Sequence, residues 1–171
     1  MNIVLLGYMG SGKSAVGKFL AKDTTLEFLD LDDFIEKKEG MSIPEIFSTK
    51  GEIYFRKKEG DYLKEVLECQ KNKVISLGGG TPCYGRNMDV ISDATENVYY
   101  LKASVDILVD RLMKEKDHRP LIKDLDEEEL PEFIKKHLFE RNFYYLRAKH
   151  IVAVDGKSVA GVSGEIRKTL V

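Results

Sequence analysis

The sequence predicts an α/β fold built on a parallel β-sheet, and two observations carry this prediction. Short apolar runs rich in β-branched and aromatic residues alternate with longer segments of helical periodicity. This alternation is typical of β–α–β units, in which a helix connects two parallel strands. The length of 171 residues, without an internal repeat or a Pro/Gly/Ser-rich linker, indicates a single domain covering residues 1–171.

Five runs are expected to form strands because each is apolar and about as short as a buried strand. They are residues 2–6, 26–29, 73–77, 97–101 and 151–154. Helical patterns are expected at 13–22, 33–39, 52–69, 105–116, 127–147 and 159–170. Ser104 and Ser158 stand directly before two of these helices, where a serine hydroxyl can accept hydrogen bonds from free backbone N–H groups.

Two segments do not fit a simple alternation of strands and helices. One is the helical stretch 41–69 between the second and third strands, and the other is the charged stretch 114–129. Additions of this kind to an α/β core commonly carry substrate sites and lids.

Composition excludes several classes of protein. The formal net charge is −2, so no general field attracts nucleic acid or anionic lipid. No apolar run approaches the roughly 20 residues that span a bilayer, and the amino terminus lacks a signal-peptide pattern, so we expect a cytoplasmic location. Cys69 and Cys83 are too few for a disulfide framework or a zinc site and are expected to be reduced thiols. The near-neutral surface favours a monomer.

The most specific motif lies directly after the first expected strand. Residues 7–14 fit G-x-x-x-x-G-K-[ST] in the required strand–loop–helix context. In this motif backbone N–H groups point at phosphate oxygens, and glycines let the chain turn without a Cβ in the way. We expect Lys13 to reach the β- and γ-phosphates of a nucleotide, and Ser14 to offer its hydroxyl to Mg²⁺ at the positive end of the following helix.

The motif alone leaves motors, GTPases, transport ATPases and small-molecule kinases open. A guanine-reading N-K-x-D pattern is absent, which argues against a GTPase. The third expected strand is followed by Gly78, Gly79 and Gly80 rather than by an acidic residue. The carboxylate that binds magnesium must therefore come from another strand, while the bare backbone of the glycine triplet permits a ligand to lie against it.

Carboxylates follow the second expected strand. At the strand period of two residues Asp30 and Asp32 point to one side, near the carboxyl end where α/β sheets bind ligands. One could hold the metal and the other an acceptor hydroxyl, whereas Asp33 is expected to cap the next helix. Phosphoryl transfer depends on positioning and charge neutralisation, so an Asp with an unshifted pKa would suffice as a weak base.

Single basic residues carry less information. Arg56, Arg119 and Arg141 suit carboxylates and phosphates, but each alone is more often a solvated side chain. The histidines show no partner pattern, so solvated or structural roles are expected for His118, His137 and His150.

Six motifs in register resemble the shikimate kinase family across almost the whole chain. They are residues 7–14, Asp30-Leu31-Asp32, Gly51-Glu52 with Phe55-Arg56, Leu77-Gly78-Gly79-Gly80, Arg119-Pro120-Leu121, and Arg141 with Tyr144. The resemblance implies a three-layer α/β/α P-loop kinase fold with a five-stranded parallel sheet, a helical substrate-binding insertion at about 31–69 and a mobile lid at about 114–126. It also implies ATP-dependent phosphorylation of the 3-hydroxyl of shikimate, in the pathway to chorismate and aromatic amino acids.

The resemblance further implies roles for individual residues. Gly10, Ser11, Gly12, Lys13, Ser14 and Ala15 would surround the ATP phosphates, with Ser14 and Asp30 at Mg²⁺. Asp32 would accept a hydrogen bond from the attacking hydroxyl. Arg56 and Arg141 would bind the shikimate carboxylate, and Gly78, Gly79 and Gly80 would give backbone contacts to the ring substituents. Arg119 would move onto the phosphates with the lid, and Arg111 would stack on adenine.

Two departures and two alternatives accompany this interpretation. Ala15 stands where the family usually has Thr, and the loop 155–157, expected over adenine, has no sharp motif. One alternative is another small-molecule kinase of the same fold, such as a gluconate kinase, against which the glycine triplet with Phe55-Arg56 argues. The other is a nucleotide-binding regulator without transfer activity, against which the intact Lys13, Ser14, Asp30 and Asp32 argue.

Overall fold

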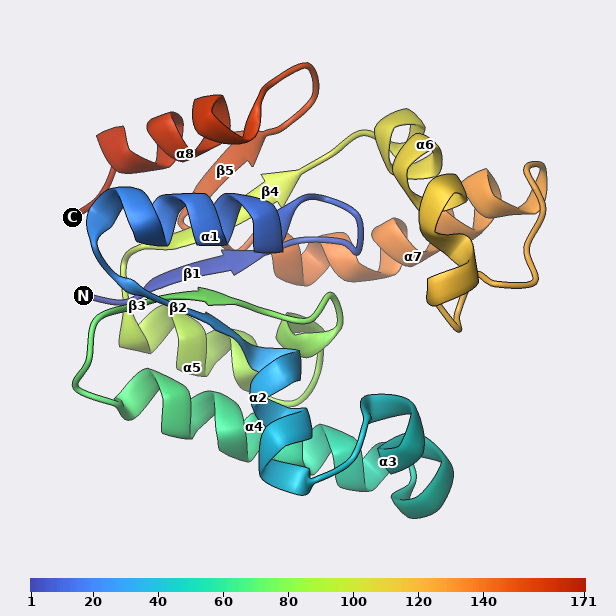
Figure 1. Ribbon diagram of the computed structural model, residues 1–171, viewed down its shortest axis with the longest axis horizontal. Coiled ribbons are helices and arrows are strands. Elements are labelled where there is room, and N and C mark those ends of the chain that lie inside the picture. The colour runs from blue at the N-terminus through green and yellow to red at the C-terminus, as the bar shows by residue number, and fades with distance from the viewer.

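The computed structural model describes all 171 residues, and a five-stranded parallel sheet lies at its centre (Figure 1). The strands are β1 (Ile3–Leu6), β2 (Glu27–Asp30), β3 (Lys73–Ser76), β4 (Val98–Lys102) and β5 (His150–Ala153). Their order across the sheet is β2-β3-β1-β4-β5, and every neighbouring pair is parallel. The predicted α/β class, the parallel sheet and its five strands are confirmed, each strand to within one residue.

Eight α-helices and two short 3₁₀ helices connect the strands. The α-helices are α1 (Lys13–Thr24), α2 (Leu31–Glu39), α3 (Ile43–Lys50), α4 (Glu52–Glu68), α5 (Asn87–Ala94), α6 (Val105–Glu115), α7 (Glu129–Tyr145) and α8 (Val159–Lys168). The 3₁₀ helices are η1 (Thr81–Cys83) and η2 (Lys116–His118). Helices α1 and α8 cover one face of the sheet and α4 and α5 the other, which makes three layers (Figure 1).

Two helices differ from the prediction. The expected helix 33–39 begins two residues earlier, at Leu31, because the Asp30 side chain accepts a hydrogen bond from the backbone N–H of Asp33. Helix α5 was not predicted: it follows Arg86, which offers no side-chain cap, so the usual signal at a helix start is missing. Ser104 and Ser158 do cap α6 and α8 as expected, by accepting from Ile107 and Gly161.

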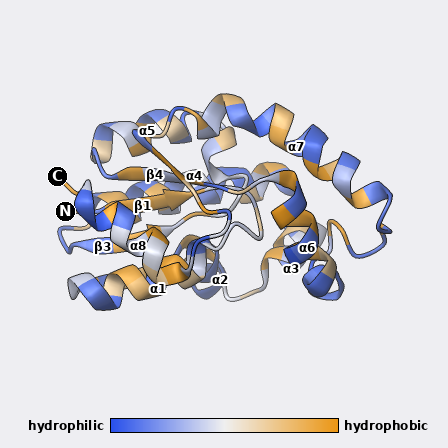
Figure 2. Cartoon of the chain, turned by 90° about the horizontal axis from the view of Figure 1, so that it is seen from above, coloured by the Kyte–Doolittle hydropathy of each residue, from blue (hydrophilic) through white to orange (hydrophobic).

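The core explains why the central strands read as continuous apolar runs. All four residues of β1 and of β3 are buried because helices pack on both faces of the sheet. The strands β1 and β4 are predominantly orange in Figure 2, whereas the helices outside them alternate between polar and apolar residues. None of the helices is long and apolar enough to span a bilayer.

The sheet order fixes where a ligand site can form. Strand β1 lies between β3 and β4, and the connections from β1 and β3 leave on opposite sides of this point. In open α/β sheets ligands bind beyond the carboxyl ends of the strands at such a reversal of order. Helices α2, α3 and α4 pack against one another beside this edge, where Tyr54 and Tyr62 both donate to the carboxylate of Glu39.

Candidate active site

The loop after β1 has the conformation that a phosphate-binding loop requires. Gly10 and Gly12 have φ values of 81° and 96°, in the left-handed region where a side chain would be strained. Gly12 is the N-cap of α1 and supplies no side-chain acceptor, so the first backbone N–H groups of the helix stay free for an anion. The Nζ atom of Lys13 donates to the carbonyls of Gly7 and Tyr8, at 2.8 and 3.0 Å, and thus lies across the loop.

Asp30 and Ser14 face each other beside this loop. The Ser14 hydroxyl donates to Oδ2 of Asp30 at 3.3 Å, while Oδ1 of Asp30 accepts from the backbone N–H of Asp33 at 3.2 Å. The expectation that Asp33 caps the helix was therefore wrong, since Asp30 is the cap. The predicted strand spacing of Asp30 and Asp32 was also wrong: Asp32 belongs to α2, although both carboxylates line one cleft.

Burial shifts the pKa values of Lys13 and Asp32 in opposite directions. Burial lowers the pKa of Lys13 to about 8, against the attraction of Asp32. Burial also raises the pKa of Asp32 to about 7, and the negative charges of Asp30 and Glu59 add to this rise. The unshifted Asp of the sequence analysis is thus replaced by a carboxyl whose pKa lies near neutrality, the range in which general bases are most effective.

Each glycine of the triplet lies against a different predicted side chain. A Cβ on Gly78 would stand 2.8 Å from Oδ1 of Asp32, and one on Gly79 would stand 3.0 Å from a guanidinium nitrogen of Arg141. A Cβ on Gly80 would likewise stand 3.0 Å from a nitrogen of Arg56. The backbone of the triplet therefore passes between the three polar groups, and a side chain at any of these positions would displace one of them.

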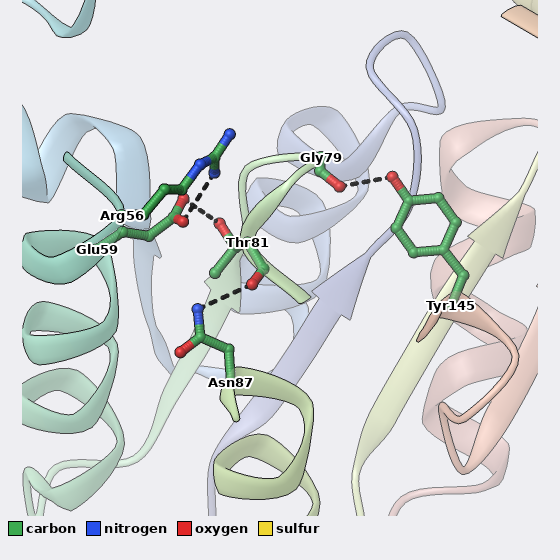
Figure 3. Close-up of polar contacts among 6 residues, drawn as sticks. All are labelled: Arg56, Glu59, Gly79, Thr81, Asn87 and Tyr145. Carbon is green, nitrogen blue, oxygen red and sulfur yellow. Dashed lines mark hydrogen bonds and ion pairs between the residues drawn. The ribbon is translucent and has the colours of Figure 1, made fainter. Parts of the chain in front are cut away.

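Arg56 is held by a buried hydrogen-bond network (Figure 3). Its guanidinium donates to Oε1 of Glu59 at 2.8 Å, and Oε2 of Glu59 accepts from the hydroxyl of Thr81 at 2.8 Å. The carbonyl of Thr81 accepts from the amide of Asn87 at 2.9 Å. The guanidinium also lies 3.8 Å from the ring centroid of Tyr84. Its Nε atom is buried without a partner, so the guanidinium keeps donors for a ligand.

Arg141 approaches the triplet from α7 on the other side. It forms no ion pair within the protein, the Tyr145 hydroxyl is its hydrogen-bonding neighbour, and its guanidinium faces the ring of Tyr8 at 5.6 Å. One turn later Tyr145, which is fully buried, donates from its hydroxyl to the carbonyl of Gly79 at 2.6 Å (Figure 3). A partly buried guanidinium without a carboxylate beside it is an anion-binding group.

The predicted nucleotide residues share a cleft of about 580 Å³, with Asp32 and two of the glycines at one end. The cleft is lined by residues 9–16, Asp30, Asp32, Asp33, residues 76–79, Arg111, Glu115, Arg119, Val154, residues 157–159 and Val162. Arg56, Gly80 and Arg141 are not part of this lining, although both arginines lie against the triplet.

Two further arginines border the cleft. Arg111 donates to the carbonyl of Gly10 at 3.0 Å and so lies directly on the phosphate-binding loop. Arg119 forms an ion pair with Glu115 at 2.9 Å, one turn away, and its positive charge helps to lower the pKa of Lys13.

Sequence reasoning missed several residues of the site. Glu59 lies in the highly charged stretch after Arg56 and reads as a surface residue, yet its side chain is only 2% exposed. Thr81 and Asn87 follow the triplet without any motif. Tyr145, rather than the neighbouring Tyr144 of the quoted motif, reaches the triplet, and the period of four residues from Arg141 on a helix was the available signal.

Comparison with known proteins agrees with this geometry. The family model described as shikimate kinase matches residues 9–171. The shikimate kinase of Flavobacterium johnsoniae is 53% identical over 157 residues, which cover 92% of this chain and 91% of the relative. The crystal structure of the shikimate kinase from Bacteroides thetaiotaomicron matches with a TM-score of 0.89 at 33% identity, covering 98% of this chain and 95% of that one.

A structure of the shikimate kinase from Acinetobacter baumannii in complex with shikimate has a TM-score of 0.85 at 30% identity, covering 98% of this chain and 90% of that one. A gluconokinase from Sinorhizobium meliloti also matches, with a TM-score of 0.54 at 17% identity and coverage of 96% and 88%. That likeness concerns the fold alone. The match to the family model and the identity to the Flavobacterium protein extend over nearly the whole length, so the chain belongs to the shikimate kinase family.

Proposed function

We propose that this protein transfers the γ-phosphoryl group of ATP to the 3-hydroxyl of shikimate, giving shikimate 3-phosphate and ADP. The observation that carries the proposal is the unpaired guanidinium of Arg141, which faces the glycine triplet opposite Arg56. Two arginines near one bare backbone segment suit a small carboxylate, because a guanidinium binds a carboxylate in a bidentate manner. Asp32, also against the triplet, lies where a hydroxyl of the same ligand would reach it.

The reaction is an in-line displacement on phosphorus. The oxygen of the 3-hydroxyl forms a bond to the γ-phosphorus while the bond from this phosphorus to the β–γ bridging oxygen breaks, and the electron pair leaves with ADP. Asp32 accepts the proton of the hydroxyl. Its raised pKa, about 7 in the free protein, makes it a better proton acceptor than an ordinary Asp and still leaves it largely ionised in mildly alkaline solution.

The phosphate-binding loop and Lys13 hold the ATP phosphates. The free N–H groups at the start of α1 and the residues Gly10, Ser11, Gly12 and Ala15 surround them. Lys13 exchanges its two backbone carbonyl partners for phosphate oxygens, and these negative charges keep its ammonium protonated. Arg111 donates to the same loop, and we propose that it stacks on the adenine of ATP.

Ser14 and Asp30 would hold Mg²⁺, directly or through water. Their oxygens lie 3.3 Å apart, and both are hard oxygen donors of the kind that Mg²⁺ prefers. Each side chain would supply one oxygen, which suits an ion that takes one or two protein oxygens and completes its shell with phosphates and water. When bound, Mg²⁺ neutralises charge on the β- and γ-phosphates.

Arg119 belongs to the segment 114–126, which we propose as a lid. It would leave Glu115 and contact the transferring phosphoryl group once both substrates are present, which excludes water from the reaction. We also propose that the protein works as a monomer, since its formal net charge of −2 makes its surface near-neutral, and in the cytosol, since it has only two cysteines and both are free.

The test compares ADP release from ATP and Mg²⁺ with shikimate, with gluconate and with no acceptor. We expect strong stimulation by shikimate only. Stimulation by gluconate only would retain the kinase class and reject the substrate, and tight ATP binding without acceptor-dependent turnover would favour the regulator. Size-exclusion chromatography with light scattering at several protein concentrations tests the monomer, and a mass of twice 19.5 kDa would contradict it.

A further inference from the structure

Helix α7 presents three side chains to the site in one line. His137, Arg141 and Tyr145 are spaced by four residues, so they lie on the same face of the helix, one turn apart. Tyr145 is bound to the carbonyl of Gly79, and His137 contacts the phosphate-binding loop. Arg141 stands between them without an ion pair, and its side-chain neighbours on this line are the Tyr145 hydroxyl and the Tyr8 ring.

Tyr8 is the residue of the phosphate-binding loop that meets this line. Its side chain is buried, its hydroxyl lies 2.9 Å from Nδ1 of His137, and its ring lies against the guanidinium of Arg141. The backbone carbonyl of the same residue accepts the hydrogen bond from Lys13. Tyr8 therefore contacts the nucleotide-binding lysine through its main chain and the carboxylate-binding arginine through its side chain.

Burial favours the uncharged form of both partners in the Tyr8–His137 hydrogen bond. Burial raises the pKa of Tyr8 to about 12, so the phenol keeps its proton. Burial also lowers the pKa of His137, with the positive charge of Arg141 acting in the same sense and Glu140 opposing it. A neutral imidazole with its proton on Nε2 accepts at Nδ1, and in that tautomer the Tyr8 hydroxyl donates the hydrogen bond. The rings of Phe133 and Tyr8 pack on His137 edge-to-face, at 4.9 and 5.6 Å between centroids, and hold its orientation.

We propose that Tyr8 and His137 are positioning residues, whose hydrogen bond holds the Tyr8 ring under Arg141 and so couples nucleotide binding to binding of the shikimate carboxylate. The inference rests on the proposed function, because it takes Arg141 as a ligand of that carboxylate. When ATP phosphates draw Lys13 away from the Tyr8 carbonyl, the backbone of Tyr8 can change its conformation. The Tyr8 ring then moves relative to Arg141, so a single residue links the two sites. Coupling between two sites is reciprocal, so shikimate must tighten nucleotide binding by the same factor.

The experiment measures the Kd of shikimate by calorimetry with and without ADP and Mg²⁺, in the full-length chain. For the unchanged protein we expect ADP to tighten shikimate binding by about 5-fold or more. Tyr8→Phe keeps the ring and removes only the hydroxyl, so we expect that ratio to fall toward one and the KM for shikimate to rise about 3- to 10-fold. Because the coupling is reciprocal, the KM for ATP at saturating shikimate should rise by the factor that the ratio loses, while the Kd of ADP without shikimate should change less than about 2-fold, a split that general loss of structure would not give.

His137 supplies the partner test. His137→Leu should reproduce the effect of Tyr8→Phe, and the double variant should be no worse than either, because both remove one hydrogen bond. His137→Asn, whose amide oxygen can accept from Tyr8, should restore part of the ratio. Tyr99→Phe is the matched control, since it removes a buried tyrosine hydroxyl that contacts Thr169 under α8, away from α7.

Arg141→Ala separates this inference from the proposed function. If that variant leaves the Kd of shikimate unchanged, the assignment of Arg141 in the proposed function is wrong and the inference falls with it. If Arg141→Ala weakens binding while Tyr8→Phe and His137→Leu alter neither the Kd nor the ratio, the positioning role alone is overturned. Equal losses in Tyr8→Phe and Tyr99→Phe would also overturn it, because they would reflect stability.

Discussion

Two arginines of the site are held in opposite ways. Arg56 binds a carboxylate whose side chain is 2% exposed, and that carboxylate also accepts from Thr81. Arg119 binds Glu115, whose side chain is 52% exposed, at nearly the same distance. Exposed ion pairs contribute about 0–1 kcal/mol to stability, whereas removing one member of a buried pair costs roughly 3–5 kcal/mol.

This difference indicates that Arg56 is held in place before substrate binds, whereas Arg119 is not. The Arg56 network joins α4, η1 and α5 through buried hydrogen bonds, so the carboxylate side is preorganised (Figure 3). Arg119 is tied only to the preceding turn of its own segment, so a phosphate can compete for it at little cost. A group that acts only in the transition state gains from such freedom, because ground-state contacts do not hold it back.

The largest effect is expected from Arg119→Ala. Removing a charge that neutralises the transferring phosphoryl group should lower kcat by about 10³-fold or more, while the free energy of unfolding changes by less than about 1 kcal/mol. Steady-state kinetics and urea denaturation measure the two quantities. Arg86→Ala, which removes an exposed ion pair outside the cleft, is the control, and similar kcat values in both variants would contradict the role of Arg119.

Glu59→Ala should disrupt the buried network that holds Arg56 in place. It leaves Arg56 and Thr81 without their acceptor, so we expect about 3–5 kcal/mol of lost stability. The KM for shikimate should rise about 10- to 100-fold, with a smaller change in the KM for ATP. Glu59→Gln keeps two polar atoms in place and should fold where the alanine variant does not. An unchanged KM for shikimate in folded Glu59→Gln, together with full stability, would show that the network does not orient Arg56.

The raised pKa of Asp32 predicts how kcat/KM and stability depend on pH. Because Asp32 must be deprotonated and Lys13 protonated, kcat/KM should rise about tenfold per pH unit below the Asp32 pKa of about 7 and fall again above the Lys13 pKa of about 8. The folded pKa lies above the ordinary value of 3.8, so the protein binds the proton more tightly when folded, and stability falls as the pH rises from about 4 to 7.

Asp32→Asn should therefore be nearly inactive yet more stable than the unchanged protein at pH 8, by roughly 2 kcal/mol or about 5 °C in Tm, and not at pH 4. Calorimetric scans at the two pH values measure this. Equal Tm differences at pH 4 and pH 8 would show that the charge of Asp32 has no folding cost.

The smallest effect is expected from Glu115→Gln. It weakens the exposed pair with Arg119, so stability should change by less than about 0.5 kcal/mol and kcat by less than about 2-fold. A loss of stability close to that of Glu59→Ala would remove the contrast between the two arginines. The same denaturation and kinetic assays serve for both variants, which makes the comparison direct.

The features that could be predicted are those encoded by residues close together in the sequence. Buried parallel strands show as apolar runs, and the phosphate-binding loop shows as glycines with Lys13 and Ser14 at fixed spacing. Glu59 could not be found in this way, because nothing near it in sequence distinguishes it from the exposed charges around it. Its burial results from α4 packing against η1 and α5, which are contacts between distant segments.

The prediction that Asp32 lies in the cleft with Asp30 is confirmed, but the secondary structure assumed for it was wrong. The strand period placed it beside Asp30, but the helix starts at Leu31 and Asp32 reaches the cleft from its first turn. The shift of its pKa depends on burial and on Glu59, neither of which sequence spacing reveals. The roles of Asp32 and of the arginines in catalysis stay predictions until the variants are measured.

The glycine triplet also limits how this site could evolve. Because each glycine lies against a different polar group, one added methyl group at any of them disturbs one recognition element and leaves the other two in place. Few substitutions of these glycines are therefore expected to be neutral during evolution toward a different phosphoryl acceptor. Changes at Arg141, which has no ion pair, meet no such barrier, so substrate preference is expected to drift through Arg141 while the backbone of the triplet stays constant.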